Sequence, residues 1–180
     1  MIRRSLLPIL FGLTILPSGC RESTRPTPED PIGFSLTRGS GAFVFDMPEG
    51  SQAETVDVLY HIPATGSIED MPILLVLHGA DRNAASYREA WRDLAEAKQC
   101  MVFAPVFTDA DYPGSRSYQQ GNMYDISGQL LPESQWLFSC IEPLFDEVLA
   151  RTSVLQPSYD MWGHSGGAQF VHRYVLFGDA

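Results

Sequence analysis

The sequence predicts an α/β domain with a mainly parallel sheet, flanking helices and an antiparallel edge. Two continuous apolar runs, at 72–77 ("PILLVL") and 101–105 ("MVFAP"), are typical of parallel strands that are covered on both faces. From residue 72 onward, strand and helix patterns alternate, as in successive βαβ units. Before them, residues 55–62 ("TVDVLYHI") alternate apolar and polar side chains, which indicates a half-buried strand near an edge.

The first half of the domain contains three predicted strands and one predicted helix. A short aromatic strand is expected at 41–46, followed by the alternating strand at 55–62 and, after a turn-rich stretch, the apolar strand at 72–77. A helix is expected from residue 83 or 84 to 97, because its apolar and small residues recur at roughly helical spacing.

The second half begins with the buried strand at 101–105. Residues 108–132 are polar and contain glycine, and they are too many for a simple connector, so we expect a functional loop with some structure of its own. A helix with an apolar stripe is predicted at 135–149, a short strand at 158–162, and a second helix from 166 through 174.

Composition limits the partners that the protein can have. The 180 residues allow one domain with a sizeable core, and 44% hydrophobic with 19% charged residues is ordinary for a globular protein. The net charge is −10 and Lys98 is the only lysine, so the chain has no basic patch for phosphates and nucleic acid is not expected to bind. The absence of a CxxC motif and of paired-histidine spacing predicts no metal site, and no cofactor is expected.

The N-terminus has the pattern of an export signal. Residues 1–20 combine Arg3 and Arg4 with an apolar stretch too short to span a bilayer, then small residues before Cys20. This ending resembles a bacterial lipobox, which implies lipidation of Cys20 and a lipid anchor as the only membrane contact. Pro17 replaces the usual leucine, so plain secretion remains the alternative. Residues 21–40 are expected to form a flexible linker and residues 41–180 the domain.

Two further cysteines, Cys100 and Cys140, would share an oxidising compartment. Both lie in apolar surroundings, which favours two separately buried thiols, with a disulfide bridge as the alternative.

The segment "MWGHSGGAQFV" carries the main functional signal. Gly163, Ser165 and Gly167 fit the pattern G-x-S-x-G, between a predicted strand and a predicted helix. In this context the turn raises the serine hydroxyl above the sheet edge, and the helix N-terminus favours negative charge there. A second segment, "VLHGADRN", places His78, Gly79 and Ala80 directly after the central strand.

Together with "VFAPVF" and "YPGSRSYQQGN", these segments resemble α/β-hydrolases, and among them secreted esterases of the polyhydroxybutyrate-depolymerase and feruloyl-esterase type. The resemblance covers about residues 56–177. It implies that Ser165 is the nucleophile and that the backbone N–H groups of Gly166 and Ala80 form the oxyanion hole. Asp81 is a competitor for the second donor, and an ordinary helix N-cap is the alternative role for Ser165.

The resemblance also implies an aspartate or glutamate and a histidine after the serine. His172 lies two helical turns beyond Ser165, and His164, His78 and His61 are also poorly placed by sequence. The acid and base are therefore expected beyond Ala180, in keeping with an incomplete α/β-hydrolase fold that lacks its C-terminal strands.

The predicted function is a serine hydrolase that cleaves small-molecule or polymeric carboxylic esters through an acyl-enzyme. Two alternatives stay open, a non-catalytic surface lipoprotein that uses the fold for binding and a serine peptidase of the same fold. The loop tyrosines Tyr112, Tyr118 and Tyr124 are expected either to shape the substrate pocket or to be structural.

Overall fold

The computed structural model describes residues 35–152 and 154–178. The predicted signal peptide with Cys20, and most of the predicted linker, lie outside the described residues. Within the described part, no helix combines the length and the apolar character that a membrane span requires.

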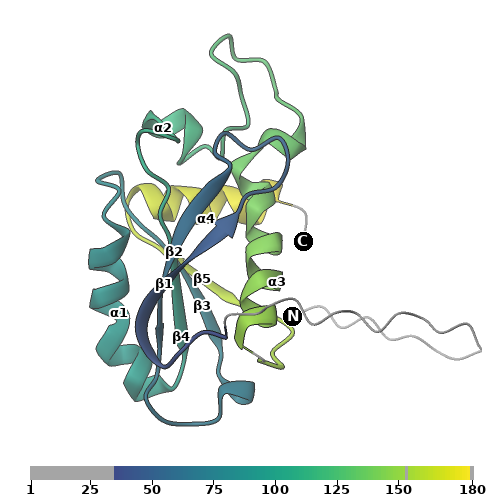
Figure 1. Ribbon diagram of the computed structural model, residues 1–180. Helices are drawn as coiled ribbons and strands as arrows, with labels where there is room; N and C mark the ends of the chain where they lie inside the picture. The colour runs from purple at the N-terminus through teal and green to yellow at the C-terminus, as the bar shows by residue number, and fades with distance from the viewer. Residues whose placement is uncertain (1–34, 153, 179–180) are drawn as a thin grey trace, which may run out of the picture. The chain divides into compact units, whose positions relative to one another are not determined.

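One five-stranded mixed sheet forms the centre of the domain, in the order β1-β2-β4-β3-β5 (Figure 1). Strands β3, β4 and β5 are parallel to one another, whereas β1 and β2 run antiparallel at one edge. The strand bounds are Gly39–Asp46 (β1), Thr55–Ile62 (β2), Ile73–Leu77 (β3), Met101–Pro105 (β4) and Asp160–Gly163 (β5). The predicted α/β class, with its antiparallel edge, is therefore confirmed.

Helices cover both faces of this sheet. Helix α1 (Ala84–Lys98) lies on one side, and α3 (Ile141–Thr152) and α4 (Gly166–Phe177) lie on the other (Figure 1). A short helix α2 (Gly114–Ser117) lies above the sheet in the view of Figure 1. The described residues also form short 3-10 turns at Ile68–Asp70 (η1), Glu133–Gln135 (η2) and Leu137–Cys140 (η3).

Strand β3 shows why the apolar runs in the sequence are continuous. Leu75 and Leu77 face the larger core with α3 and α4, whereas Val76 faces the smaller core with α1. Because successive side chains of a strand point to opposite faces, a strand between two helical layers needs apolar residues at every position. Burial of each such side chain stabilises the fold by about 1.5–3 kcal/mol relative to exposure.

Two predicted boundaries differ from the structure. The folded unit begins before residue 41, because β1 starts at Gly39 and the Leu36 N–H already donates to the carbonyl of Arg151. The helix expected from residue 135 begins at Ile141, after two 3-10 turns. Pro143 explains the later start, because in a continuous helix its ring would clash with the Ser139 carbonyl, whereas proline is tolerated in a first turn.

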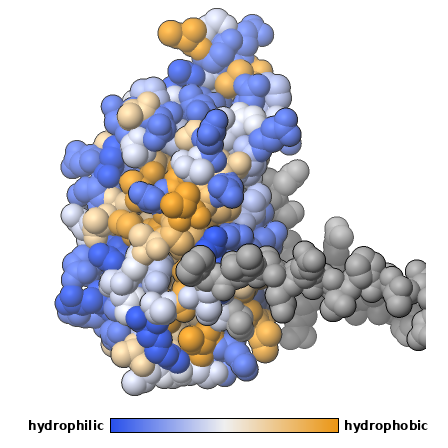
Figure 2. All heavy atoms as spheres, viewed as in Figure 1, coloured by the Kyte–Doolittle hydropathy of each residue, from blue (hydrophilic) through white to orange (hydrophobic). Residues whose placement is uncertain are grey.

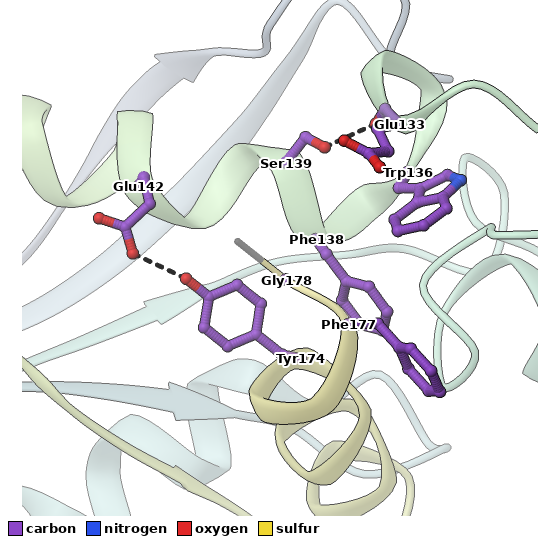
Figure 3. A pocket seen from close by; sticks show the side chains of 8 residues that line it. All are labelled: Glu133, Trp136, Phe138, Ser139, Glu142, Tyr174, Phe177 and Gly178. Atoms are coloured by element: carbon purple, nitrogen blue, oxygen red, sulfur yellow. Dashed lines mark hydrogen bonds between the residues drawn. The ribbon is translucent and has the colours of Figure 1, made fainter. Parts of the chain in front are cut away.

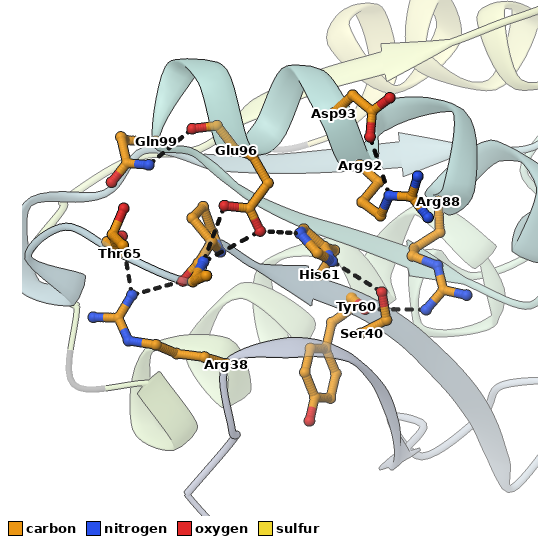
Figure 4. A network of polar contacts seen from close by, with 12 residues as sticks. Arg38, Ser40, Tyr60, His61, Thr65, Arg88, Arg92, Asp93, Glu96 and Gln99 are labelled. Carbon is orange, nitrogen blue, oxygen red and sulfur yellow. Dashed lines mark hydrogen bonds and ion pairs between the residues drawn. The ribbon is translucent and has the colours of Figure 1, made fainter.

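A polar chain connects the antiparallel edge to α1. His61 lies between Ser40 on β1 and Glu96 on α1, with 2.9 Å from one ring nitrogen to the serine oxygen and 2.9 Å from the other to the carboxylate (Figure 4). Glu96 also accepts hydrogen bonds from the Ala64 N–H, at 3.0 and 3.2 Å. These contacts, first the Ala64 bond and then His61, hold the pKa of Glu96 below its ordinary value.

We expect Glu96→Gln to change how stability depends on pH. A carboxylate whose pKa is lowered by folding contributes stability above its unfolded pKa of about 4.3 and loses it as pH falls through the folded value. Wild type should therefore be more stable than Glu96→Gln at pH 7, and the difference should shrink below about pH 4. Urea unfolding between about pH 3 and pH 7 measures the free energy of unfolding of both proteins. Glu89→Gln on the same helix is the control, and an equal pH response in both variants would contradict the assignment.

Candidate active site

Ser165 occupies a sharp turn between β5 and α4. Its backbone has φ 53° and ψ −115°, which is the left-handed side of conformational space that a non-glycine residue rarely adopts. Such a conformation costs about 1–3 kcal/mol and persists only when the surroundings impose it. Ser165 is exposed, and although it takes the N-cap position of α4, its side chain makes no capping hydrogen bond. The hydroxyl is thus presented at the surface instead of being used to cap the helix.

Two glycines make this turn possible. A Cβ atom on Gly163 would lie 2.3 Å from the carbonyl carbon of Gly167. A Cβ atom on Gly167 would lie 2.1 Å from the carbonyl oxygen of Leu77, at the end of β3. Real Cβ atoms do not approach backbone this closely, so both positions require glycine. The first contact closes the turn on itself, and the second brings the serine turn directly against the end of the central strand.

The turn after β3 lies beside the serine turn, as the two sequence motifs predict. A Cβ atom on Gly79 would be 3.8 Å from the Cβ of Ser165, and one on Gly166 would be 3.1 Å from the backbone nitrogen of Ala80. Of the two backbone amides that the sequence offers for this place, that of Ala80 is therefore closer to Gly166 than that of Asp81. Among the described residues, neither the Ala80 N–H nor the Gly166 N–H has a hydrogen-bond acceptor. Two unpaired amides at one place, one of them at a helix N-terminus, favour the accumulation of negative charge.

His78 stabilises the turn after β3 from the buried side. It is fully buried, its Nδ1 lies 2.9 Å from the carbonyl oxygen of Gly79, and its Nε2 accepts a hydrogen bond from the Phe107 N–H at 3.1 Å. Burial lowers the pKa of His78, which favours the neutral ring, and because Nε2 accepts a hydrogen bond the proton of that ring is on Nδ1. Tyr118 stacks on the ring and donates a hydrogen bond to the His78 carbonyl at 2.6 Å. His78 is therefore a structural residue of the turn and is not available as a base.

Arg82 is a residue of the site that sequence reasoning missed. Its guanidinium donates to the carbonyls of Tyr112 at 2.6 Å and Gly114 at 3.0 Å, and it lies over the ring of Tyr118, 4.2 Å from the centroid. Arg82 thereby fixes the long loop after β4 to the turn after β3. A cation in a turn gives no sequence signal for this role, because the carbonyls that it binds lie about 30 residues away.

The three loop tyrosines have different surroundings. Tyr112 and Tyr118 are buried in the larger core, where desolvation raises the pKa of each. Tyr124 is exposed, at the base of a small hairpin in which it pairs with Leu130. The hairpin projects beyond the body of the domain, and apolar side chains stand at its end (Figure 2). Ile126 is 94% exposed and Leu130 is 60% exposed.

No histidine of the described residues contacts Ser165. The Nδ1 atom of His164 is hydrogen-bonded to the hydroxyl of Tyr87, a residue of α1, at 2.9 Å. His61 belongs to the polar chain at the antiparallel edge. His172 is exposed on α4, about 10 Å along the helix axis from the serine. Residues 35–178 thus place the serine and two amides together but no triad histidine.

Two hollows near the C-terminal end of α4 lie away from the serine. One of about 210 Å³ is lined by residues of η2, η3, α3 and the C-terminal end of α4, among them Trp136, Phe138 and Phe177 (Figure 3). A second, of about 360 Å³, lies between β5 and α4. Both share Glu142, which accepts a hydrogen bond from Tyr174 at 2.7 Å. Gly178 lines both hollows and is about 18 Å along α4 from the serine turn, so neither hollow adjoins Ser165.

The remaining chemical groups of the described part suggest no second site. Cys100 and Cys140 are free thiols that belong to the two different cores on opposite faces of the sheet. Burial raises the pKa of Cys140 to about 12. Within the described ranges, no three potential ligands among His, Cys, Asp and Glu gather in a way that could hold a metal ion.

Solved structures with the same architecture include two hydrolases of polymers. Poly(aspartic acid) hydrolase-1 from Sphingomonas sp. KT-1 is 41% identical, with a TM-score of 0.71 over 78% of this chain and 52% of that one. A poly(3-hydroxybutyrate) depolymerase from Bordetella parapertussis is 26% identical, with a TM-score of 0.67 over 77% of this chain and 47% of that one. A thermostable esterase, at 16% identity and a TM-score of 0.50 over 73% and 36% of the two chains, shares the fold alone.

This chain spans about half the length of the first two solved proteins. No family model matches the sequence, and no curated protein matches it significantly. The mixed sheet, the serine turn between β5 and α4, and the likeness to these structures agree with one another. The chain belongs to the α/β-hydrolase superfamily, of whose esterase-type fold it contains a five-stranded part.

Proposed function

We propose that this chain supplies the nucleophile and the oxyanion hole of a serine hydrolase that cleaves carboxylic esters. The observation that carries the proposal is the geometry at Ser165. An exposed hydroxyl on a strained turn stands beside two unpaired backbone amides, those of Gly166 and Ala80. This combination suits acyl transfer, in which an oxygen nucleophile attacks a carbonyl and negative charge develops on the carbonyl oxygen.

The reaction proceeds in two halves. The Ser165 oxygen bonds to the carbonyl carbon, its proton passes to a histidine base, and the carbonyl electron pair becomes an oxyanion facing the two amides. When the oxyanion collapses, the bond to the alcohol breaks and the alcohol takes the proton, which leaves an ester between Ser165 and the acyl group. Water then releases the acid by the same steps. Because no described histidine contacts Ser165, the proposal includes a histidine and a carboxylate outside residues 35–178.

Polymeric esters are included among the substrates for two reasons. The poly(3-hydroxybutyrate) depolymerase among the structural relatives acts, by its name, on a polyester. The projecting hairpin with exposed Ile126 and Leu130 offers apolar surface on the same loop that packs against the site. Small esters remain equally suited to the nucleophile itself.

Amide hydrolysis is the second candidate, and the serine peptidase alternative is part of it. Poly(aspartic acid) hydrolase-1, at 41% identity, takes its name from a polymer joined by amide bonds. A polyanionic substrate is opposed by the net charge of −10, although salt at physiological strength screens such repulsion beyond about 8 Å. We therefore place neutral esters first.

Burst kinetics test the proposal. The full-length gene product is mixed with a p-nitrophenyl ester of an acid whose acyl-enzyme hydrolyses slowly. A first burst of nitrophenol equal in amount to the enzyme is expected, because acylation of Ser165 releases nitrophenol before the slower hydrolysis. A matched p-nitroanilide measures amide cleavage. Faster ester turnover supports the first candidate and faster anilide turnover the second. Absence of both burst and turnover would favour the non-catalytic binding domain.

We further propose that the protein is exported and anchored through a lipid on Cys20. The cationic start, the apolar stretch and the lipobox-like ending support this. The mass of the N-terminal peptide of the membrane-extracted protein tests it. A diacylglycerol-modified peptide beginning at Cys20 is expected, and an unmodified peptide that begins elsewhere would overturn the proposal.

A further inference from the structure

A third polar group faces the two amides of the candidate oxyanion hole. A Cβ atom built on Gly166 would have the Nε2 atom of Gln119 as its nearest neighbour, at 2.9 Å, followed by the Ala80 nitrogen at 3.1 Å and the Gln119 Cγ at 3.2 Å. The side-chain amide of Gln119 and the backbone amide of Ala80 therefore approach Gly166 from the same side. Glycine at position 166 keeps this space open for both groups.

The Gln119 backbone is held from several directions. The preceding residue, Tyr118, is fully buried and donates its hydroxyl proton to the carbonyl of His78. The Gly121 N–H donates back to the Tyr118 carbonyl at 2.8 Å. On the other side, Arg173 of α4 donates to the Gln119 carbonyl at 3.4 Å. These contacts fix the position of Gln119 relative to both the turn after β3 and the helix after Ser165.

The side chain itself has no competing partner. Gln119 is half-buried, and among the described residues no acceptor takes a hydrogen bond from its Nε2. A glutamine amide offers two N–H donors and no charge. A neutral donor that is held in place before the reaction stabilises an oxyanion without the cost of reorientation, and one such donor contributes about 10²–10³-fold to kcat in known cases.

We propose that Gln119 is a catalytic residue whose Nε2–H donates a third hydrogen bond to the oxyanion formed when Ser165 attacks a substrate carbonyl. The inference rests on the proposed function, because it needs acyl transfer at Ser165. The role is specific to the step in which the Ser165 oxygen bonds to carbon, the proton goes to the histidine base, and the carbonyl electrons move to oxygen. Gln119 takes no proton, and it stabilises the charge that this step creates.

The test uses the full-length protein with Gln119→Ala and Gln119→Glu. Glutamate has nearly the same shape as glutamine, but its carboxylate accepts hydrogen bonds and carries negative charge. The variant therefore removes the donor without a change in side-chain volume. We expect Gln119→Ala to lower kcat for a p-nitrophenyl ester by about 10–10²-fold with KM within about twofold, and Gln119→Glu to lower kcat at least as much. Gln52→Ala, which removes an exposed glutamine of the loop between β1 and β2, is the matched control and should behave as wild type.

A boronic acid inhibitor gives a second readout, because its tetrahedral adduct with the serine resembles the oxyanion state. Its affinity should fall in parallel with kcat/KM in the Gln119 variants, while inhibition by the carboxylic acid product stays unchanged. Circular dichroism and the melting temperature confirm that each variant is folded. A merely structural role would not separate the two inhibitors.

The outcomes distinguish this inference from the function on which it rests. If Gln119→Ala keeps kcat within twofold of wild type while Ser165→Ala is inactive, the role of Gln119 is wrong and the serine hydrolase stands. A rise in KM at constant kcat would assign Gln119 to substrate binding and overturn its role in the oxyanion hole. If wild type neither turns over esters nor reacts with the boronic acid, the proposed function fails and this inference fails with it.

Discussion

Ser165→Ala is expected to lower ester turnover of the full-length protein by about 10⁴-fold or more, with the fold retained. The alanine removes the only atom that can form the acyl-enzyme at this turn, whereas the amides of Gly166 and Ala80 remain in place. Loss of a serine nucleophile in this type of site leaves a small residual rate that comes from the oxyanion hole and substrate binding. Steady-state turnover of a p-nitrophenyl ester measures the loss.

A fluorophosphonate probe gives an independent measurement of the same prediction. The probe should label wild type at Ser165, as located by peptide mass spectrometry, and should leave Ser165→Ala unlabelled. Ser86→Ala, which removes an exposed serine of α1, should label and turn over as wild type does. Equal labelling of wild type and Ser165→Ala would show that the nucleophile lies elsewhere.

Gly167→Ala is expected to destabilise the domain by about 3 kcal/mol or more. The added methyl would lie 2.1 Å from the Leu77 carbonyl oxygen and 2.7 Å from the His78 carbonyl oxygen, both backbone atoms of the central strand end. Relief of this clash requires α4 to move away from β3, because no flexible side chain can yield instead. Alanine improves helix propensity by about 1 kcal/mol, which is too small to offset overpacking against backbone. Urea unfolding measures the change in the free energy of unfolding.

Gly128→Ala is the control for Gly167→Ala. Gly128 has φ 84° in the projecting hairpin, and its added methyl would meet no heavy atom within 4 Å. Only the left-handed backbone penalty of about 1–2 kcal/mol applies there. A loss at Gly167 no larger than the loss at Gly128 would contradict the close approach of the serine turn to the central strand.

The strands were the most predictable part of the fold, because their signals are local. The apolar run at 101–105 and the alternating run at 55–62 coincide with β4 and β2. The start of α3 was less predictable. Its apolar stripe extends through residues that form 3-10 turns instead, since both conformations repeat at nearly the same spacing and the position of Pro143 decides between them.

The candidate site likewise contains residues that the sequence predicts and residues that it does not. Ser165, Gly166 and Ala80 were predicted from the resemblance to α/β-hydrolases, which two short motifs carry. The contacts of Arg82 and Gln119 were not predicted, because they depend on how the loop after β4 packs against two other turns. That packing follows from the buried ring of Tyr118 and its bond to the His78 carbonyl, and two residues 40 positions apart leave no periodic pattern in a sequence.

The positive φ of Ser165 lowers the stability of the fold at the residue that is proposed to give it activity. A conformational penalty of about 1–3 kcal/mol is a large share of the 5–15 kcal/mol by which typical domains are stable. Glycine would adopt the same angles without this penalty, so a library selected for heat resistance alone would be drawn towards the substitution Ser165→Gly and would lose the proposed nucleophile. Any directed evolution of this protein for thermal tolerance therefore needs a simultaneous screen for turnover.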